Sequence, residues 1–427
     1  MVKLTEFPNG FKLVTEKIES SRSVVISYHI GAGSGTETAL NNGISHFTEH
    51  MMFKGTDKHS SIEISKLFED YGSSNNAYTS RESTCYYVKC IDEYFYRCLE
   101  LLTEIVFDSV FPEEELNKER GVITEEYNMS FDDPEDILSD ILVEKAFEGS
   151  ALSRRIIGTL ENISRFKAKD IKEYIKERYG SNNMVLSICG NIEHDEMVEY
   201  VEKHILARCF PKVKDRDSIF AAKVDPKGGF ISYEKDFQQT SVAISFPSLP
   251  YFHEDMYKLV LICNTLGGGM SSRLFRAMRE DKGLVYNVYS AVATYVNNGA
   301  FGVSFNTSGA KLKEAMSEAV SCLYGIFKGD ISEEEFKRQL VNAKSSLIFG
   351  RENIMSIAQQ NGKYALYFGE PFDIDKHLAG YTNLTLDEVN DFARRVFSPD
   401  KISVAYVGDT KHLKNLDLLS MAKEIKA

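Results

Sequence analysis

The sequence predicts an α+β fold in which one unit, a mainly antiparallel sheet packed with helices, occurs twice along the chain. Strand-like segments recur at a fixed offset: SVVIS at 23–27 returns as SVAIS 218 residues later, and MVLSICG at 184–190 returns as ISVAYVG after the same offset. Helical segments lie between these strands without the strict alternation that is typical of a parallel sheet. A fixed offset of this kind indicates an internal duplication.

The elements of each repeat follow in the same order. A strand rich in β-branched residues opens each repeat, and a strand that ends in glycine closes it. Between them, 61–72 and 94–108 carry apolar residues at i, i+3 and i+4, which predicts amphipathic helices. A further helical segment precedes each glycine strand, at 168–179 and 386–397. One further pair of segments corresponds, FPEEELNKE at 111–119 and GDISEEEFK at 329–337. Their offset is two residues longer than that of the strands, which indicates a loop insertion.

A border between the repeats is expected where the sequence becomes polar and carries both proline and glycine. It divides the chain into a first domain at 1–210, a linker at 211–228 and a second domain at 229–427. The 427 residues are enough for two domains of ordinary size.

Charge and cysteine content restrict the classes of function. The 63 acidic and 50 basic residues give a net charge of −13, which argues against nucleic acid or an anionic membrane as the main partner. No apolar run approaches the length of a membrane span, and the first residues lack the pattern of a signal or transit peptide. Seven cysteines without a CxxC pair predict reduced thiols. We therefore expect a cytoplasmic protein.

The segment GISHFTEHMMFKGT places His46, Glu49 and His50 on one face of a predicted helix. Two histidines one turn apart can bind one Zn²⁺, and the glutamate between them can accept a proton from an attacking water; a third protein ligand is also needed. The structural alternative is a buried helix with hydrogen-bonded histidines. The equivalent positions in the second repeat are Asn264, Gly267 and Gly268. The fold therefore does not need the histidines, which favours the metal site.

The histidine–glutamate order is that of the inverted zinc proteases, and HFTEHMMFKGT resembles the M16 metallopeptidase family, the pitrilysin and mitochondrial processing peptidase group. In that family the third ligand lies in a second helix, seven residues after another functional glutamate. The matching residues here are Glu126 as the ligand and Glu119 as an auxiliary acid that orients the site. Glu125 is the nearest competitor, but it lies about 100° around the helix.

Two further segments resemble this family. YGSSNNAYTSREST resembles its substrate-binding edge strand, which implies that Asn76 and Ala77 pair with an extended peptide; by itself the segment is consistent with an ordinary polar edge strand. SSRLFRAMREDKGLVYNVYS resembles a segment whose Arg and Tyr bind substrate carbonyls and the developing oxyanion, which implies these roles for Arg279 and Tyr286. Alone, that segment is an amphipathic helix with a basic face.

The resemblance extends over nearly the whole chain and implies a half-length zinc endopeptidase that cleaves peptides or unfolded polypeptide segments. It implies one zinc ion per chain and a homodimer that forms a hollow clamshell. Two alternatives share the fold: the catalytic subunit of a presequence-processing heterodimer, and a non-enzymatic assembly or scaffold subunit. The complete zinc motif argues against the scaffold. Thr48 and Val285 depart from the common family pattern, but neither change removes a chemical group that the reaction needs. The glycine pattern GAGSGTE at 31–37 does not support nucleotide binding.

Overall fold

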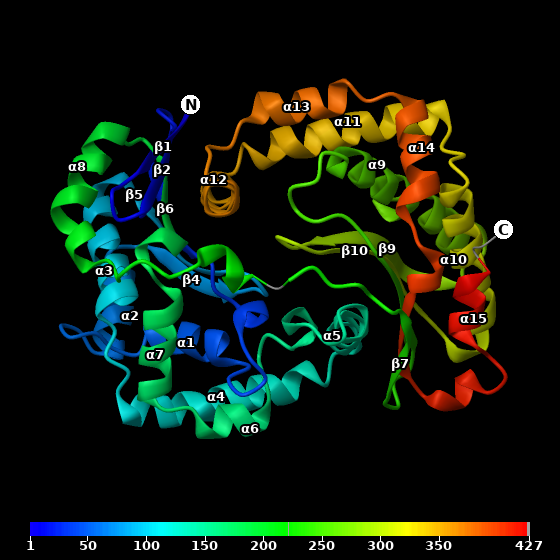
Figure 1. Cartoon of the computed structure of the whole chain (residues 1–427), viewed down its shortest axis with the longest axis horizontal. Helices are drawn as coiled ribbons and strands as arrows, with labels where there is room; N and C mark the ends of the chain where they lie inside the picture. Colours follow the sequence, from blue (N-terminus) through cyan, green and yellow to red (C-terminus); the bar gives the residue numbers. More distant parts are fainter. Residues whose placement is uncertain (221, 425–427) are drawn as a thin grey trace. The chain divides into compact units, whose positions relative to one another are not determined.

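The computed structural model describes residues 1–220 and 222–424; Ala221, in the predicted linker, and 425–427, at the end of the predicted second domain, lie outside the described residues. The chain forms two compact units, each built from segments that are distant in the sequence (Figure 1). The first unit holds Met1–Tyr127, Arg154–Phe220 and Ile348–Ile374, and the second holds the described residues of Asn128–Ser153, Ala221–Leu347 and Asp375–Ala427.

The first unit contains a six-stranded sheet of order β1-β2-β6-β3-β5-β4. In that order the strands are Val2–Glu6, Lys12–Lys17, Met184–Gly190, Ser23–Ile30, Thr84–Ile91 and Ser74–Thr79. The pair β2–β6 is parallel and all other pairs are antiparallel. Strand β4 forms one edge, so one side of its main chain has no neighbouring strand in this sheet.

The second unit contains a five-stranded sheet of order β7-β11-β8-β10-β9. In that order the strands are Gly229–Glu234, Ser403–Gly408, Thr240–Pro247, Gly299–Thr307 and Val285–Thr294. Again one pair, β7–β11, is parallel and the others are antiparallel. Apart from β1, the two sheets have the same strand order and directions, which confirms the predicted duplicated α+β fold with mainly antiparallel sheets.

Both units also contain helices, some of which cover the sheets. In the first unit they are α1 (Ile44–Met52), α2 (Ser61–Asp70), α3 (Phe95–Asp108), α4 (Glu113–Ser130, as far as Tyr127), α6 (Leu160–Arg165), α7 (Ala168–Arg178), α8 (His194–His204) and α12 (Ile354–Phe368). In the second they are α5 (Pro134–Ala146), α9 (Met256–Gly267), α10 (Leu312–Phe327), α11 (Glu333–Gly350, as far as Leu347), α13 (Ile374–Thr382, from Asp375), α14 (Leu386–Val396) and α15 (Leu418–Lys423). Both lists refer to the described residues.

The first sheet is covered on both faces because its central strands are apolar on both sides. Alternate residues of β3 point in opposite directions, so Ile26 and Tyr28 join the core formed with α1 and α3. Val25 packs on the other side with Ile357 and Ala358 of α12. This helix lies close to the sheet: a Cβ atom on Gly362 would stand 2.2 Å from Cδ2 of His29.

The second sheet is covered in the same way, but by a helix from the first half of the chain. Ile137, Leu138 and Ile141 of α5 pack with Ala243, Ala405 and Val407 of the sheet. The compact units therefore exchange α5 and α12 relative to the sequence order. The boundaries 1–210, 211–228 and 229–427 describe the duplication and stay a prediction; the packing follows the apolar faces of the sheets, which a repeat offset does not reveal.

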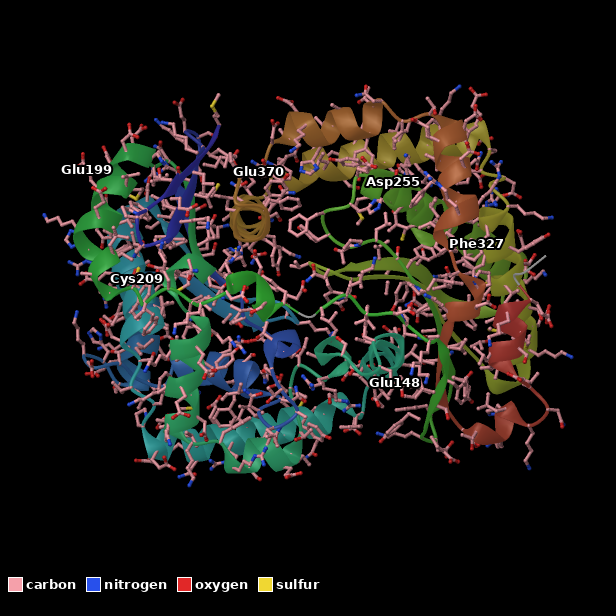
Figure 2. The ribbon with its side chains drawn as sticks, in the orientation of Figure 1. Glu148, Glu199, Cys209, Asp255, Phe327 and Glu370 are labelled. Carbon is pink, nitrogen blue, oxygen red and sulfur yellow. The ribbon has the colours of Figure 1, made fainter. Side chains whose placement is uncertain are left out.

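The thiols and the helix hydropathy bear on two further expectations. All seven cysteines lie within the described residues, and none of them forms a disulfide there. Cys209, labelled in Figure 2, donates a hydrogen bond from its Sγ to the main-chain oxygen of Ile205 at 3.6 Å. Within the described residues, every helix is too short or too polar to cross a membrane.

Candidate metal centre

Three side chains from two helices converge in the first unit: His46 and His50 from α1, and Glu126 from α4. Nε2 of His46 lies 3.5 Å from one oxygen of Glu126, and Nε2 of His50 lies 3.4 Å from the other. The three potential ligand atoms all lie within 4.8 Å of one another. Helical spacing accounts for the pair of histidines, since residues i and i+4 share a face.

These separations fit a tetrahedral zinc ion. Ligand atoms at about 2.0–2.1 Å from such a metal stand about 3.4 Å apart, close to the two histidine–carboxylate distances. Imidazole nitrogen and carboxylate oxygen are also donors that zinc prefers. The side chain of Glu126 is 48% exposed, so one side of the group is open, as a catalytic zinc site requires. The described residues contain no second group of this kind.

The two imidazole rings are held differently. Nδ1 of His50 lies 2.8 Å from one oxygen of Glu119, and Nζ of Lys54 donates to the other oxygen at 2.7 Å. Glu119 thus orients His50 through the ring nitrogen that is not directed at Glu126. Nδ1 of His46 is buried and has no hydrogen-bond partner among the described residues. The His46 ring packs edge-on against His50, with 4.6 Å between the centroids.

These contacts shift the pKa values of His50, Glu119 and Glu126 in the directions that favour a positive charge between them. Burial lowers the pKa of His50, but hydrogen bonds to Glu119 and Glu126 outweigh it and raise this pKa to about 9. Burial also opposes ionisation of Glu119, yet His50 and Lys54 hold its pKa below the usual value. Hydrogen bonds from His46 and His50 hold the pKa of Glu126 well below its usual range. The negative charge that stabilises a proton on His50 would equally stabilise a metal cation there.

The start of α1 is fixed by a buried carboxylate that sequence reasoning missed. Gly43, the N-cap, has φ of +99° and no side chain to cap the helix. Instead Glu37 accepts hydrogen bonds from the main-chain N–H groups of Gly43 and Ser45, both at 2.8 Å, and from Nδ2 of Asn42 at 2.9 Å. A carboxylate is favoured at a helix N-terminus. Glu37 therefore sets the position of the helix that carries His46, and its place at the end of the glycine-rich 31–37 segment was the available signal.

Glu49, the predicted general base, lies beside the edge strand. Its Oε2 accepts a hydrogen bond from Oγ1 of Thr79, the last residue of β4, at 2.5 Å. The side chain of Glu49 does not belong to the group of potential metal ligands. The two histidines thus belong to the group of potential ligands, and the carboxylate between them in the sequence does not. Thr79 was not predicted as a site residue.

The predicted peptide-binding residues lie in β4, at the edge of the first sheet. Asn76 is exposed, and Ala77 is partly buried against the core. The main-chain N–H of Ala77 donates to Oδ1 of Asn76 at 2.8 Å, so it is directed to a side chain and not to the neighbouring β5. A peptide strand could bind this N–H if the Asn76 amide turned away.

In the second unit, Arg279 and Tyr286 are brought together by a π-helical segment, Phe275–Asp281. The guanidinium carbon of Arg279 lies 5.0 Å from the ring centroid of Tyr286 and 4.8 Å from that of Phe275. Cation–π attraction therefore holds the arginine between two rings. Tyr286 is 74% exposed, which leaves its hydroxyl accessible. Phe275 was not predicted; its signal was the spacing of four residues from Arg279.

The second unit shows why its equivalent helix lacks the zinc motif. Gly267, at the position equivalent to Glu49, ends α9 against strand β9. A Cβ atom there would stand 2.4 Å from the main-chain nitrogen of Ser290. A glutamate at this position would collide with β9, whereas Glu49 has room to bond Thr79 in β4.

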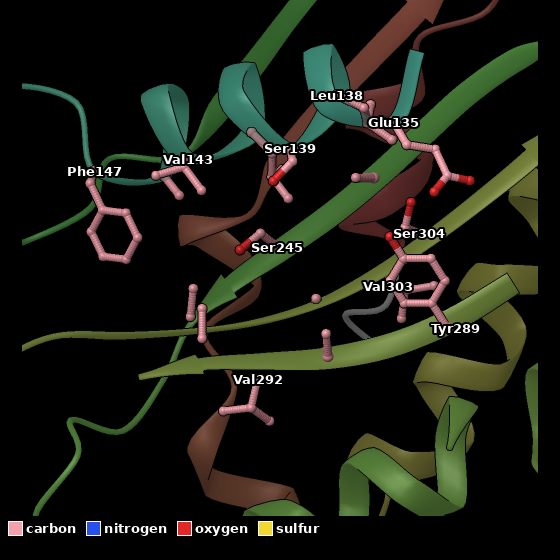
Figure 3. Close-up of a pocket in the computed structure, with 17 residues that line it drawn as sticks. Glu135, Leu138, Ser139, Val143, Phe147, Ser245, Tyr289, Val292, Val303 and Ser304 are labelled. Atoms are coloured by element: carbon pink, nitrogen blue, oxygen red, sulfur yellow. The ribbon is translucent and has the colours of Figure 1, made fainter. Parts of the chain in front are cut away.

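The second unit also contains a cavity of about 180 Å³ between α5 and the sheet (Figure 3). Leu138 and Val143 of α5 line one side, and Ser245, Val292 and Val303 line the strands opposite. Its lining includes no histidine, cysteine or lysine from the described residues. The cavity is mainly apolar, and we assign no chemistry to it.

Comparison with known proteins shows which family this chain resembles. The family model described as insulinase (peptidase family M16) matches residues 12–160, and the model described as the peptidase M16 inactive domain matches residues 165–341. A Bacillus subtilis protein named uncharacterized zinc protease YmxG is 35% identical over 404 residues, which cover 94% of this chain and 97% of the relative. A Rickettsia felis protein named uncharacterized zinc protease is 31% identical over 398 residues, which cover 92% of this chain and 95% of the relative.

Two solved structures share the fold over almost the whole chain. The peptidase M16 inactive domain from Pseudomonas fluorescens has a TM-score of 0.88 at 18% identity and covers 96% of this chain and 98% of its own. A protease from Helicobacter pylori has a TM-score of 0.88 at 21% identity, and the match covers 96% of this chain and 99% of that protease chain. At these identities the likeness concerns the fold alone. The family models and the relatives of above 30% identity, however, show that the chain belongs to the M16 family of peptidases.

Proposed function

We propose that this protein is a zinc-dependent endopeptidase that cleaves peptides or unfolded polypeptide segments. The observation that carries the proposal is the convergence of His46, His50 and Glu126, whose potential ligand atoms all lie within 4.8 Å of one another, with Glu49 on the same helix but outside this group. The names of the relatives, zinc proteases, support the same metal and reaction class. We also propose a cytoplasmic location, supported by the seven free thiols.

Each residue has a distinct task in this proposal. His46, His50 and Glu126 would hold the metal, and Glu119 would keep the His50 ring in the ligating orientation. Zinc, when bound, supplies Lewis acidity that makes the scissile carbonyl and the attacking water more reactive. Glu49 would accept the proton of that water at a carboxylate oxygen. It would then deliver the proton to the amide nitrogen as the C–N bond breaks.

The direct test uses the purified chain, a peptide library and mass spectrometry. We expect about one zinc ion per chain, because one repeat supplies all three ligands. Cleavage should stop when a chelator removes the metal and return when zinc is added back. Internal cleavage that continues after the metal has been removed would contradict the proposal.

Peptide binding at β4 can be tested by removing one donor. Ala77→Pro deletes the N–H that points away from β5 and fixes φ, and proline is tolerated at a sheet edge. We expect impaired peptide cleavage, mainly through a higher KM, with unchanged zinc content. Ala77→Ser, which keeps the N–H, should retain most of the cleavage that the proline variant loses. Normal kinetics in Ala77→Pro would show that substrate binds elsewhere.

We further propose a homodimer in which Glu49 of one chain acts with Arg279 and Tyr286 of the other; the resemblance to the family's clamshell supports it. Homodimers of Glu49→Gln, and of Arg279→Ala combined with Tyr286→Phe, should each be nearly inactive. A mixed dimer would contain one complete site of two, so activity should return to about half of the wild type. Mixed dimers confirmed by differential tags that stay inactive would exclude a shared site.

A further inference from the structure

We propose that Thr79 is a positioning residue for Glu49, a role that rests on the proposed peptidase function. Its hydroxyl holds one carboxylate oxygen of Glu49, so that the other oxygen is directed to the attacking water and then to the leaving nitrogen. The strand proposed to bind the peptide would thus also orient the group that exchanges the proton.

The hydrogen bond itself is short and has a defined direction. Oγ1 of Thr79 lies 2.5 Å from Oε2 of Glu49. An ionised carboxylate only accepts hydrogen bonds, so the threonine hydroxyl must donate its single proton. A glutamate side chain has three rotatable bonds, and fixing one oxygen removes most of that freedom before substrate arrives. Proton transfer requires such a placement within hydrogen-bond reach of the reacting atoms.

The threonine can act as a fixed donor because its own main chain is fixed. Thr79 pairs with Thr84 across a tight turn, in which the N–H of Ser80 donates to the main-chain oxygen of Ser83 at 2.7 Å. Oγ1 of Thr84 lies 3.4 Å from Oγ1 of Thr79. The hydroxyl of Thr84 donates its own proton to the main-chain oxygen of Ala32 at 2.9 Å. Oγ1 of Thr84 could then accept from Thr79, but the carboxylate of Glu49 is much closer, at 2.5 Å against 3.4 Å, and the Thr79 hydroxyl donates to it.

The glycine-rich loop 31–37 holds both partners of this hydrogen bond. Its main-chain N–H groups at Ser34 and Gly35 donate to the carbonyl oxygens of Ser80 and Arg81 at 3.2 and 2.6 Å, directly after Thr79. At the end of the same loop, Glu37 caps the helix that carries Glu49. A Cβ atom at residue 33 would stand 2.3 Å from the oxygen at residue 80. The absence of a side chain at Gly33 therefore permits the close approach that fixes strand and helix relative to each other.

The decisive comparison is between Thr79→Val, which keeps the shape but loses the donor, and Thr79→Ser, which keeps the donor. Thr79→Val should lower kcat by about 10- to 100-fold, because a misplaced catalytic group costs about that much. KM and zinc content should stay at the wild-type values, and Thr79→Ser should recover most of the lost kcat. Thr48→Val is the matched control, since it makes the same change in the helix that carries Glu49, at a buried hydroxyl with no hydrogen-bond partner among the described residues; it should leave kcat unchanged.

A second readout does not depend on activity. In a Glu49→Gln background, adding Thr79→Val should leave the affinity for a fluorescent substrate peptide unchanged, because the strand itself is intact. Weaker peptide binding by the valine variant, or equal losses of kcat in Thr79→Val and Thr79→Ser, would assign Thr79 a merely structural role and overturn the proposal. Wild-type kcat in Thr79→Val would also overturn it while leaving the peptidase function intact. A wild-type protein that cleaves no peptide would refute both.

Discussion

Glu49→Gln is expected to lower kcat for peptide cleavage by about 10²- to 10⁴-fold, the usual contribution of a general acid–base group. The change removes a proton acceptor but no metal ligand, since the converging group consists of His46, His50 and Glu126. The amide has nearly the same shape as the carboxylate, and its carbonyl oxygen can still accept the hydrogen bond from Thr79. Zinc content measured by mass spectrometry should therefore equal that of the wild type. The peptide KM should change little.

Glu125→Gln is the matched control for this experiment. It makes the same change in charge on the neighbouring helix, at an exposed residue outside the converging group. Its kcat should remain at the wild-type level, so a general loss of negative charge near the site can be separated from loss of the base. Substantial peptidase activity in a clean Glu49→Gln preparation would disprove the role assigned to Glu49.

Glu126→Ala is expected to release zinc, with an affinity loss greater than the 10- to 100-fold that follows removal of a residue behind a ligand. The carboxylate of Glu126 reaches both histidines, at 3.5 and 3.4 Å, so its removal leaves only two ligands, on one helix. Competition with a chromophoric chelator measures the affinity directly. Cleavage should be lost at zinc concentrations that saturate the wild type and return in part at much higher ones.

Two further variants in α4 test whether the loss of zinc is specific to Glu126. Glu119→Gln should weaken zinc binding by about 10- to 100-fold, because it changes the partner of His50 Nδ1 and not a potential ligand. Glu125→Ala should bind zinc as the wild type does. If Glu126→Ala kept zinc tightly and Glu125→Ala lost it, the assignment of the third ligand would be wrong.

The sequence predicts those features that depend on local spacing or on repetition. Residues i, i+3 and i+4 share a helix face, so the arrangement of His46, Glu49 and His50 could be predicted directly. The repeat offset indicated two similar sheets, and the structure has them. The roles of Glu126 and Glu119 needed the family resemblance, because their helix could equally have been a solvated acidic surface.

The features that sequence reasoning missed depend on contacts between distant segments. Glu37, Thr79 and Phe275 each act through a partner in another element or another turn. Their side-chain types are common in loops, strand ends and helices, so no local pattern distinguishes them. The exchange of α5 and α12 was missed for a similar reason: periodicity predicts that a helix has an apolar face, but not which sheet that face covers.

This exchange has a consequence for how the protein is made. When a ribosome has synthesised the first 210 residues, every strand of the first sheet is present, but Val25 and Cys189 still lack the apolar cover that Ile357 and Ala358 provide. The first unit can be completed only when the chain has emerged to the end of α12, at Phe368. Nascent chains must therefore keep an exposed apolar sheet face from the end of β6, at Gly190, until α12 has emerged, a state prone to aggregation that chaperones would shield. A gene cut between the two repeats would leave both products in that state permanently.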